Sequence, residues 1–271
     1  MARTDAAFVG KIPELYDRLM GPMLFQPYAA DMAGRLTGLT GGDVLETAAG
    51  TGILSRAMVA ALPASVAITA TDLNQPMLDH AAAQQGAARV TWRQADAQAL
   101  PFADQSFDVV VCQFGVMFFP DKAAGYREAF RVLKPGGRFL FNVWSALELS
   151  PIPHTVQQAV AAQFPADPPQ FVARTPHGYH DIAAITVALG AAGFAAITAE
   201  RRTERSRAVS AHAAAMAFCQ GTPLRAEIEA RDPARLDAVT GAAARALGER
   251  LGAGGIEAPM EAIVFSATRP G

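Results

Sequence analysis

The sequence contains little cysteine, no long apolar run and no surplus of either charge. Its two cysteines, Cys112 and Cys219, lie far apart in 271 residues, which argues against a disulfide scaffold and favours a reducing, cytoplasmic setting. No stretch of about 18 residues is apolar and free of charge, so we expect no transmembrane helix and no membrane partner. The first residues also lack the apolar core and the cleavage site of a secretory signal.

The charge balance disfavours a large nucleic-acid interface. Lys and Arg number 23 against 25 Asp and Glu, the formal net charge is −2 at pH 7, and no long basic block is present. Proteins that bind a phosphate backbone present an excess of positive charge, although a local basic patch stays compatible with this balance. We therefore expect no nucleic acid as the partner. The sequence leaves open whether the chain is a monomer or a homodimer.

One short segment points to a ligand. Residues 44–52 read VLETAAGTG: an apolar run ends in an acid, small residues with two glycines follow, and the helix-like stretch ILSRAMVAAL comes next. This is the pattern of a buried parallel strand that turns sharply into a helix. Glycine lets backbone amides approach a ligand, and a helix N-terminus is a polar edge. The turn therefore predicts a nucleotide-like cofactor site.

Strand-like and helix-like runs alternate from residue 42 to residue 145, and the apolar fraction of 51% is ample for a sizeable core. This alternation predicts a parallel, doubly wound α/β sheet. The later part is less regular, with helical patterns at residues 151–169, 181–193 and 210–252. Two further strand-like runs read AAITAERRTERS and MEAIVFSATR.

Four elements in the first half occur in a recognisable order. They are VLETAAGTG, TATDLNQPML, QADAQALPFADQSFDVVVCQFGVMFF and REAFRVLKPGGRFLFNVW. Together they resemble the class I S-adenosylmethionine (SAM) dependent methyltransferases, in particular the type 11, ubiquinone-biosynthesis-like group that acts on small molecules. The resemblance implies SAM as cofactor, S-adenosylhomocysteine as product, and a Rossmann-like seven-stranded sheet whose seventh strand is antiparallel and lies beside the fifth.

The resemblance also implies a division of the chain. Residues 1–40 would form an N-terminal helical lid and residues 41–145 the SAM-binding core. Residues 146–209 would continue the core and carry a substrate-side loop. Residues 210–257 would be a helical cap inserted before the final strand at 258–271.

Several residues match the positions that hold the cofactor in this family. The resemblance implies that Glu46 meets the methionine amino group and that Asp72 accepts hydrogen bonds from the ribose hydroxyls. The ordinary alternative for Asp72 is a cap for the helix near Asn74. The full set implied to contact SAM is Glu46, Ala48, Gly50, Gly52, Asp72, Leu73, Met77, Asp96, Ala97, Gln113 and Phe114.

The adenine side of this set has its own ordinary alternative. The Asp96 carboxylate would take the exocyclic amine, and the amide of Ala97 would donate to a ring nitrogen. Leu73 and Met77 would sandwich the ring, although such side chains also serve as plain core packing.

The turn departs from the family pattern at one position. The family's first glycine is Ala48 here, and Ala49 follows. Alanine does not adopt a positive φ cheaply. Gly50 and Gly52 remain at the tightest part of the turn, so we expect cofactor binding to survive.

The segment after the fourth strand bears on the acceptor. It reads QFGVMFF where methyltransferases acting on amino groups of nucleic acid or protein glutamine often read NPPY or DPPY, which argues against that chemistry. Phe114, Met117, Phe118 and Phe119 suggest an apolar acceptor pocket, and at least one of the four is expected to be core. In the later segment CQGTPL, Gln220 and Thr222 are candidates to face the acceptor, and Cys219 is expected to be a buried structural thiol.

Three histidines are weak candidates for a catalytic base. His154, His177 and His180 each titrate near neutral pH in the ordinary case, but a polar surface loop is the plainer explanation for each. The pair in HGYHD has no third ligand at a familiar spacing, so we predict no metal site.

The hypothesis is methyl transfer from SAM by direct displacement. Displacement on an activated methyl group needs alignment more than a catalytic triad, and the acceptor atom stays open among oxygen, nitrogen, carbon and sulfur.

Three other functions compete with this hypothesis. A dinucleotide-dependent oxidoreductase predicts G-x-G-x-x-G, but Ser55 stands where the third glycine belongs. A SAM-binding protein without methyltransferase activity, with a regulatory or assembly role, is the second. A macromolecular methyltransferase is the third, disfavoured by the absence of a basic tail.

Overall fold

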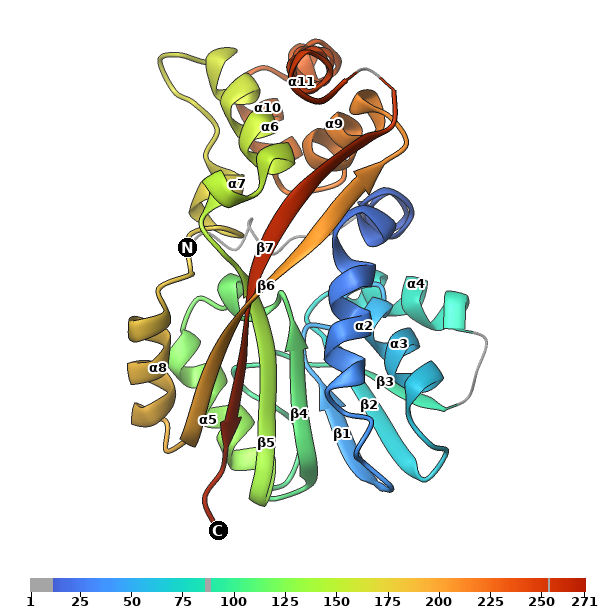
Figure 1. The fold of residues 1–271 in the computed structure, drawn as a ribbon, viewed down its shortest axis with the longest axis vertical. Helices are drawn as coiled ribbons and strands as arrows, with labels where there is room; N and C mark the ends of the chain where they lie inside the picture. Colours follow the sequence, from blue (N-terminus) through green and yellow to red (C-terminus); the bar gives the residue numbers. More distant parts are fainter. Residues whose placement is uncertain (1–11, 86–88, 253) are drawn as a thin grey trace.

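The computed structural model describes residues 12–85, 89–252 and 254–271. Seven strands form one sheet in the order β3-β2-β1-β4-β5-β7-β6 (Figure 1). The strands are β1 (Gly42–Glu46), β2 (Val66–Asp72), β3 (Val90–Gln94), β4 (Phe107–Gln113), β5 (Leu133–Trp144), β6 (Ala195–Ala208) and β7 (Ile256–Thr268). The first five pair in parallel, and β7 is antiparallel to both β5 and β6. This confirms the expected Rossmann-like sheet with its antiparallel seventh strand.

Helices surround this sheet and extend beyond one end of it. They are α1 (Ile12–Leu15), the π-helical segment η2 (Tyr16–Phe25), α2 (Gln26–Gly34), α3 (Ile53–Ala61), α4 (Gln75–Gln85), η3 (Val116–Phe118), α5 (Lys122–Val132), η4 (Leu147–Leu149), α6 (Pro151–Ala162), α7 (Phe171–Arg174), α8 (Ile182–Ala191), α9 (Ala211–Gln220), α10 (Leu224–Arg231), η5 (Pro233–Arg235) and α11 (Leu236–Leu251). Among the described residues no helix combines the length and the apolar character needed to cross a membrane.

The inner strands are apolar almost throughout. Val44 and Leu45 of β1 and Val110 and Val111 of β4 are fully buried, because helices cover both faces of a parallel sheet. Polar side chains mark the helix starts instead: the N-caps of α5, α8 and α9 accept hydrogen bonds from amides three residues on, and they are Asp121, Asp181 and Ser210.

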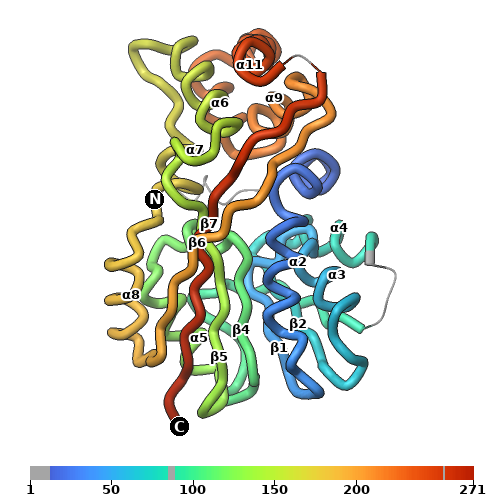
Figure 2. Tube along the Cα trace, viewed as in Figure 1, coloured from blue at the N-terminus to red at the C-terminus, as the bar shows by residue number. Residues whose placement is uncertain are grey.

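A second layer of helices lies beyond one end of the sheet. Helices α6, α7, α9, α10 and α11 gather there, and β6 and β7 run from the sheet into this layer (Figures 1 and 2). Helix α6 packs against α11 and α9, so residues before β6 join the residues between β6 and β7 in one helical layer. The helices between β6 and β7 lie where the cap insertion was expected.

Two expected boundaries differ from the structure. β7 begins at Ile256, two residues before the expected start at 258, and β6 continues to Ala208 beyond the expected run at 195–206. Both strands are longer because Arg207 and Ala208 continue the pairing with Glu257 and Ile256. Of the expected N-terminal lid, residues 1–11 lie outside the described residues, and the division of the chain into domains remains a prediction.

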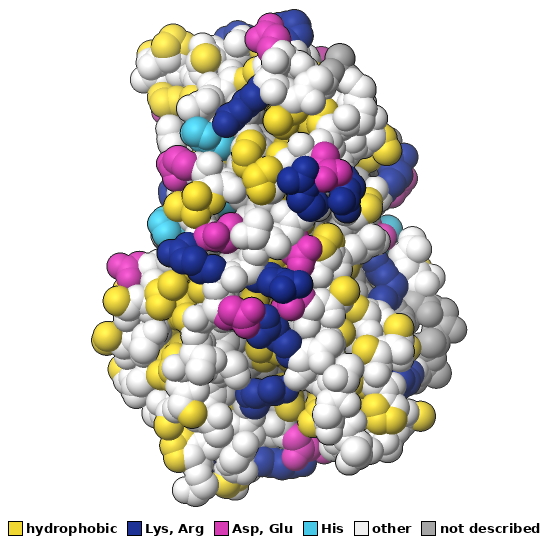
Figure 3. All heavy atoms as spheres, in the orientation of Figure 1, with side chains coloured by type: hydrophobic (Ala, Val, Ile, Leu, Met, Phe, Trp, Pro, Cys, Tyr) yellow, Lys and Arg dark blue, Asp and Glu magenta, His cyan; other side chains and the backbone are white. Residues whose placement is uncertain are grey.

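Strand β6 is an edge strand with charged side chains on its solvent side. Its four arginines, at positions 201, 202, 205 and 207, are paired with the acids Asp31, Glu204, Glu257 and Glu261. In Figure 3, basic and acidic side chains alternate over the middle of this face. Charge on an exposed edge discourages pairing with another strand, as expected for a solvated face.

Candidate functional site

The turn between β1 and α3 requires both of its glycines. Gly50 has φ +55° and Gly52 has φ +77°, a region that glycine enters without cost. A Cβ at Gly52 would lie 2.8 Å from Cη2 of Trp92 and 3.1 Å from Cβ of Ala81. A larger residue at position 52 would collide with Trp92 of β3 and Ala81 of α4, so glycine is needed where α3 begins.

Ala48 adopts the left-handed conformation that was expected to be costly. Its φ is +53°, at a cost of about 1 kcal/mol for an L-residue with a Cβ. The position opposite makes room for this side chain, since a Cβ added at Gly115 would lie only 2.4 Å from Cβ of Ala48. The missing family glycine is thus matched by a glycine at the end of β4.

A cavity lies beside this turn, and we call it the turn cavity. It encloses about 300 Å³ of empty space, part of it continuous with solvent, and is lined by Tyr16, Phe25, Glu46, Ala48, Ala49, Gly50, Thr51, Ile53, Leu54 and Gln113. Among the residues that the structure describes, Oγ1 of Thr51 and Oε1 of Gln113 are buried without a hydrogen-bond partner. A buried polar atom left unpaired costs about 1–3 kcal/mol, so both atoms are suited to bind a polar ligand.

Glu46 provides the buried acid of the turn cavity. Its side chain is 1% exposed and accepts a hydrogen bond from Oγ of Ser55. Burial, together with the neighbouring charge of Asp72, raises the pKa of Glu46 to about 8, against the opposing effect of the Ser55 hydrogen bond. A bound cationic amine would favour the charged carboxylate and lower this pKa again.

Asp72 ties the end of β2 to the turn. Its carboxylate accepts hydrogen bonds from the amide of Gly50, at 2.9 Å, and from the amide of Asn74, at 2.8 Å. Burial raises the pKa of Asp72. The capping contact near Asn74 is therefore present and is combined with a direct bond to the glycine turn. The ribose role of Asp72 remains a prediction.

The residues expected around adenine do not line the turn cavity. Leu73 is 51% exposed, which is unusual for a leucine, whereas Met77 is 3% exposed. Asp96 accepts hydrogen bonds from the amide and the side chain of Gln98, and Ala97 packs against the core. Their contacts with adenine remain predictions.

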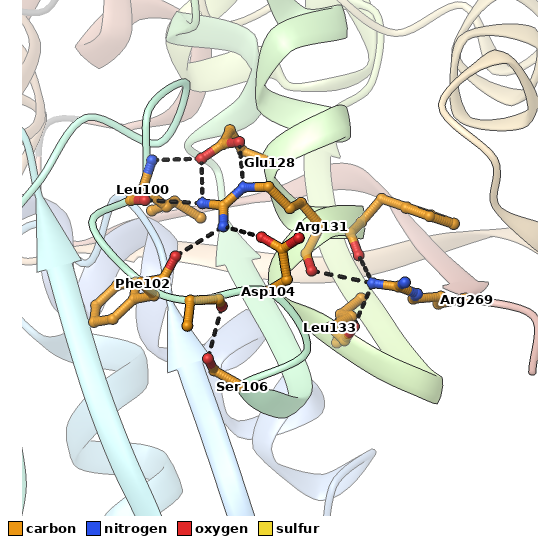
Figure 4. Close-up of polar contacts among 10 residues, drawn as sticks. Leu100, Phe102, Asp104, Ser106, Glu128, Arg131, Leu133 and Arg269 are labelled. Atoms are coloured by element: carbon orange, nitrogen blue, oxygen red, sulfur yellow. Dashed lines mark hydrogen bonds and ion pairs between the residues drawn. The ribbon is translucent and has the colours of Figure 1, made fainter.

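An arginine on α5 fixes the loop that carries Asp96 and Ala97, a feature absent from the sequence interpretation. Arg131 donates to the carbonyls of Leu100 and Phe102 at 2.9 and 2.8 Å (Figure 4). Glu128 holds the Arg131 guanidinium and also accepts the amide of Leu100 at 2.6 Å. These contacts fix the later part of the loop against the last turns of α5.

A larger cavity adjoins the turn cavity, and we call it the apolar cavity. It encloses about 590 Å³ of empty space, again partly continuous with solvent, and is lined by Tyr16, Met20, Leu24, Phe25, Phe114, Met117, Phe118, Trp144, Ser150, Pro153, Phe171, Val172, Pro176, His177, Phe218, Thr222 and Met260. Tyr16 and Phe25 line both cavities and stack on each other with centroids 4.9 Å apart. These two rings of η2 therefore form a common wall.

Three of the four side chains expected at an acceptor pocket line the apolar cavity, and binding of an acceptor there stays a prediction. Phe114, Met117 and Phe118 line the apolar cavity, and Phe114 stacks on Trp144 with centroids 3.9 Å apart and an interplanar angle of 11°. Phe119 is core instead, since a Cβ at Gly125 would lie 2.6 Å from its ring. The sequence pattern alone could not show which of the four side chains is core.

The structure separates the three candidate histidines. His177 lines the apolar cavity, is 5% exposed, and its Nδ1 lies 2.8 Å from the carbonyl oxygen of Ser145. His180 is exposed and its Nδ1 donates to the carbonyl of His177, whereas His154 on α6 lies outside the residues that line this cavity. In the described ranges no group of three or more His, Cys, Asp or Glu side chains is placed to hold a metal.

The segment 219–222 contributes one side chain to the apolar cavity. Thr222 lines it, whereas Gln220 bonds to Asp237 and Thr240. Cys219 is fully buried, and burial raises the pKa of its thiol to about 12, in keeping with a structural thiol.

Comparison with known proteins identifies the core. Residues 45–141 match the family model described as a methyltransferase domain. Over these 97 of 271 residues the chain is similar to a methyltransferase domain. Two curated relatives are ubiquinone/menaquinone biosynthesis C-methyltransferases UbiE. The one from Geotalea daltonii is 39% identical over 108 residues, covering 38% of this chain and 46% of the relative. The one from Bartonella quintana is 40% identical over 115 residues, covering 41% and 44%. The chain thus matches less than half the length of each.

Solved structures agree on the fold around this methyltransferase domain. A putative methyltransferase from Bacillus halodurans superposes with a TM-score of 0.56 at 20% identity, covering 89% of this chain and 99% of that one. Phosphoethanolamine N-methyltransferase 2 of Haemonchus contortus with S-adenosyl-L-methionine gives 0.58 at 16% identity, covering 97% and 61%. The [4+2]-cyclase SpnF also gives 0.58 at 20%, covering 97% and 95%, so the fold alone does not fix the reaction.

Proposed function

We propose that this chain transfers a methyl group from SAM to a small-molecule acceptor by direct displacement. The observation that carries the proposal is the pair of adjoining cavities. One lies at the glycine turn of the methyltransferase domain and contains unpaired polar atoms, the other is apolar, and both share the rings of Tyr16 and Phe25. A methyl donor and an acceptor that are bound in adjoining cavities can react with each other directly.

The residues of the turn cavity fit the polar end of SAM. Thr51 Oγ1 and Gln113 Oε1 offer unpaired groups to the methionine part, and the Glu46 carboxylate offers a partner for its amine. Asp72 would take the ribose hydroxyls, and the exposed face of Leu73 would pack on adenine. When bound, SAM supplies a methyl group that is already activated on a sulfonium.

The protein's own contribution is alignment and exclusion of water. Tyr16 and Phe25 line both cavities, and Phe114 and Trp144, stacked on each other, line the apolar one. Holding two reactants in a near-attack geometry lowers the barrier by about 7–11 kcal/mol in favourable cases. No catalytic triad is needed for this part of the reaction.

A SAM-binding protein without methyltransferase activity is the alternative. This alternative is favoured by Ala48, which stands where the family has its first glycine. Gly115, however, accommodates the Ala48 side chain. A [4+2]-cyclase has a similar fold, so the fold does not exclude this alternative, and the tests below include it. A cytoplasmic location and a monomeric or homodimeric state stay predictions.

Titration calorimetry tests the proposed cofactor. We expect micromolar binding of SAM and S-adenosylhomocysteine and no binding of NADH. Absence of adenosyl binding would overturn the proposal, and binding without methylation of any acceptor in a screen of small alcohols, thiols and amines would favour the alternative function.

Thr51→Val sharpens the test because it removes only the unpaired hydroxyl. We expect the free energy of unfolding of the ligand-free protein to stay equal or rise by about 1 kcal/mol, since a buried unsatisfied group is lost. The affinity for SAM should fall about tenfold, equivalent to one hydrogen bond. Thr198→Val on the exposed edge of β6 is the matched control and should leave the affinity unchanged.

A further inference from the structure

The apolar cavity has no counter-charge for an ionic acceptor. Among the described residues that line it, none is Asp, Glu, Lys or Arg. A buried charge without a partner is strongly unfavourable, and aromatic rings return only part of that cost to a cation. An ammonium or carboxylate acceptor would therefore bind poorly, and an uncharged one is favoured.

The walls are shaped for a flat ring. Phe114 and Trp144 are stacked and nearly parallel, and Phe25 approaches both rings with centroids 5.8 and 6.2 Å away. Aromatic rings prefer offset-stacked or edge-to-face neighbours. An aromatic acceptor can make both kinds of contact in this cavity.

His177 supplies one basic nitrogen. The carbonyl of Ser145 has no hydrogen to give, so Nδ1 of His177 must be the donor in their 2.8 Å contact. The proton of a neutral imidazole is then on Nδ1, which leaves Nε2 with its lone pair. Nε2 has no hydrogen-bond partner among the described residues, and stacking on Trp144 fixes the ring plane.

Two hydroxyl side chains on this wall, those of Thr222 and Ser150, are already engaged. Oγ1 of Thr222 donates to the carbonyl of Phe218 at 2.6 Å and accepts the amide of Leu224. Oγ of Ser150 accepts the amide of Glu261. Nε2 of His177 is therefore the acceptor best placed to receive a hydroxyl proton from a bound molecule.

We infer that the acceptor is an uncharged phenol and that Nε2 of His177 takes the proton of its hydroxyl group. The inference rests on the proposed function and names its substrate class. The phenolic oxygen gains a bond to the methyl carbon, and the methyl–sulfur bond breaks with its electron pair on sulfur. The hydroxyl proton moves to Nε2, so the products are an aryl methyl ether, S-adenosylhomocysteine and an imidazolium that returns its proton to solvent.

A weak base is sufficient for this step. Burial lowers the pKa of His177 to about 4, which keeps the imidazole neutral at pH 7. The groups that act on it are the Ser145 carbonyl, His180 and Glu148. As the ether bond forms, the hydroxyl proton becomes far more acidic than an imidazolium, so proton transfer to Nε2 is downhill late in the reaction.

Binding of three probes tests the substrate class. Calorimetry of the protein saturated with S-adenosylhomocysteine would compare 2-naphthol, 2-naphthylmethylammonium and 2-naphthoate. We expect 2-naphthol to bind at least about tenfold more tightly than either ion. Equal or tighter binding of an ion, or no binding of 2-naphthol, would overturn the inference. Failure of S-adenosylhomocysteine itself to bind would instead overturn the proposed function, so the two failures are distinguishable.

The variant His177→Asn tests the base. Asparagine keeps a donor for the Ser145 carbonyl and removes the basic nitrogen. With 2-naphthol as substrate, kcat should fall by at least about 100-fold while KM and the affinity for S-adenosylhomocysteine stay within about threefold. His212→Asn, at an exposed position on α9, is the control and should keep its turnover. Three results would overturn the assignment: full activity of His177→Asn, a parallel loss of cofactor affinity, or binding of 2-naphthol without methylation by the wild type.

Discussion

At the scale of single residues, the site depends on which positions lack a Cβ. Ala48 has one at a positive φ, and Gly115 lacks one where it would touch Ala48. The two positions are 67 residues apart in the printed sequence, so no local rule links them. The glycine pattern of the turn predicts the cofactor side from sequence, but the compensation at Gly115 is visible only in three dimensions.

Gly115→Ala measures this packing. The new Cβ would lie 2.4 Å from Cβ of Ala48 and 2.7 Å from Sγ of Cys112. We expect the free energy of unfolding to fall by about 1–3 kcal/mol, as for other overpacked cores. Adding Ala48→Gly should recover part of the loss, because it removes one of the two clashes and relieves the left-handed alanine. Strictly additive effects in urea unfolding of the two single variants and the double variant would contradict the account.

Glu46 makes cofactor binding release a proton. Its pKa near 8 keeps the carboxyl largely protonated at pH 7, and a bound ammonium group would favour the ionised form. We expect release of up to one proton on SAM binding, measured by calorimetry in two buffers of different ionisation enthalpy. Glu46→Gln should abolish the release, and Asp79→Asn on α4 should not. Equal proton release by wild type and Glu46→Gln would refute the role of Glu46.

At the scale of elements, η2 is fastened to the cofactor turn. Asp17 pairs with Arg56 of α3 at 2.8 Å and with His80 of α4 at 3.5 Å. Arg56 in turn donates to the carbonyl of Thr51 at 2.7 Å. The ring of Tyr16, next in sequence to Asp17, lines both cavities. The position of the shared wall therefore depends on this ion pair.

Asp17→Asn should loosen that wall. Partly exposed ion pairs contribute up to about 1 kcal/mol, so we expect SAM to bind about fivefold more weakly by calorimetry. Glu229→Gln, which breaks the exposed pair with Arg225, is the control and should leave the affinity as it is. Unchanged affinity in Asp17→Asn would separate η2 from cofactor binding.

The elements also show how much of the structure could be predicted from the sequence. Strands β1 to β5 were predictable because buried apolar runs such as residues 107–112 alternate with capped helices. The walls of the apolar cavity were not, because Tyr16, Trp144, Phe171 and Met260 come from four distant segments. Local pattern distinguishes a strand from a helix, but it does not tell which apolar side chain faces a cavity and which, like Phe119, is core.

At the scale of the whole molecule, two buried groups give stability opposite dependences on pH. The folded-state pKa of His177 is lowered to about 4, so the unfolded chain binds a proton that the folded chain refuses. Stability is therefore lost as pH falls from about 6.5 to about 4. The folded-state pKa of Glu46 is raised to about 8, so its contribution is lost as pH rises from about 4.5 to about 8.

The comparison of wild type with His177→Asn isolates the first dependence. From pH 7 to pH 5, the unfolding free energy of the wild type relative to the variant should fall by about 2 kcal/mol. Urea unfolding at the two pH values measures it. A difference that is independent of pH would mean that His177 is not buried in its neutral form.

The most direct measurement of the central claim is a crystal structure with S-adenosylhomocysteine. We predict that the methionine end lies in the turn cavity against Glu46, Thr51 and Gln113, and that the sulfur lies where Tyr16 and Phe25 separate this cavity from the apolar one. The ribose hydroxyls should meet Asp72. A ligand bound in the apolar cavity, or anywhere away from the glycine turn, would contradict the account.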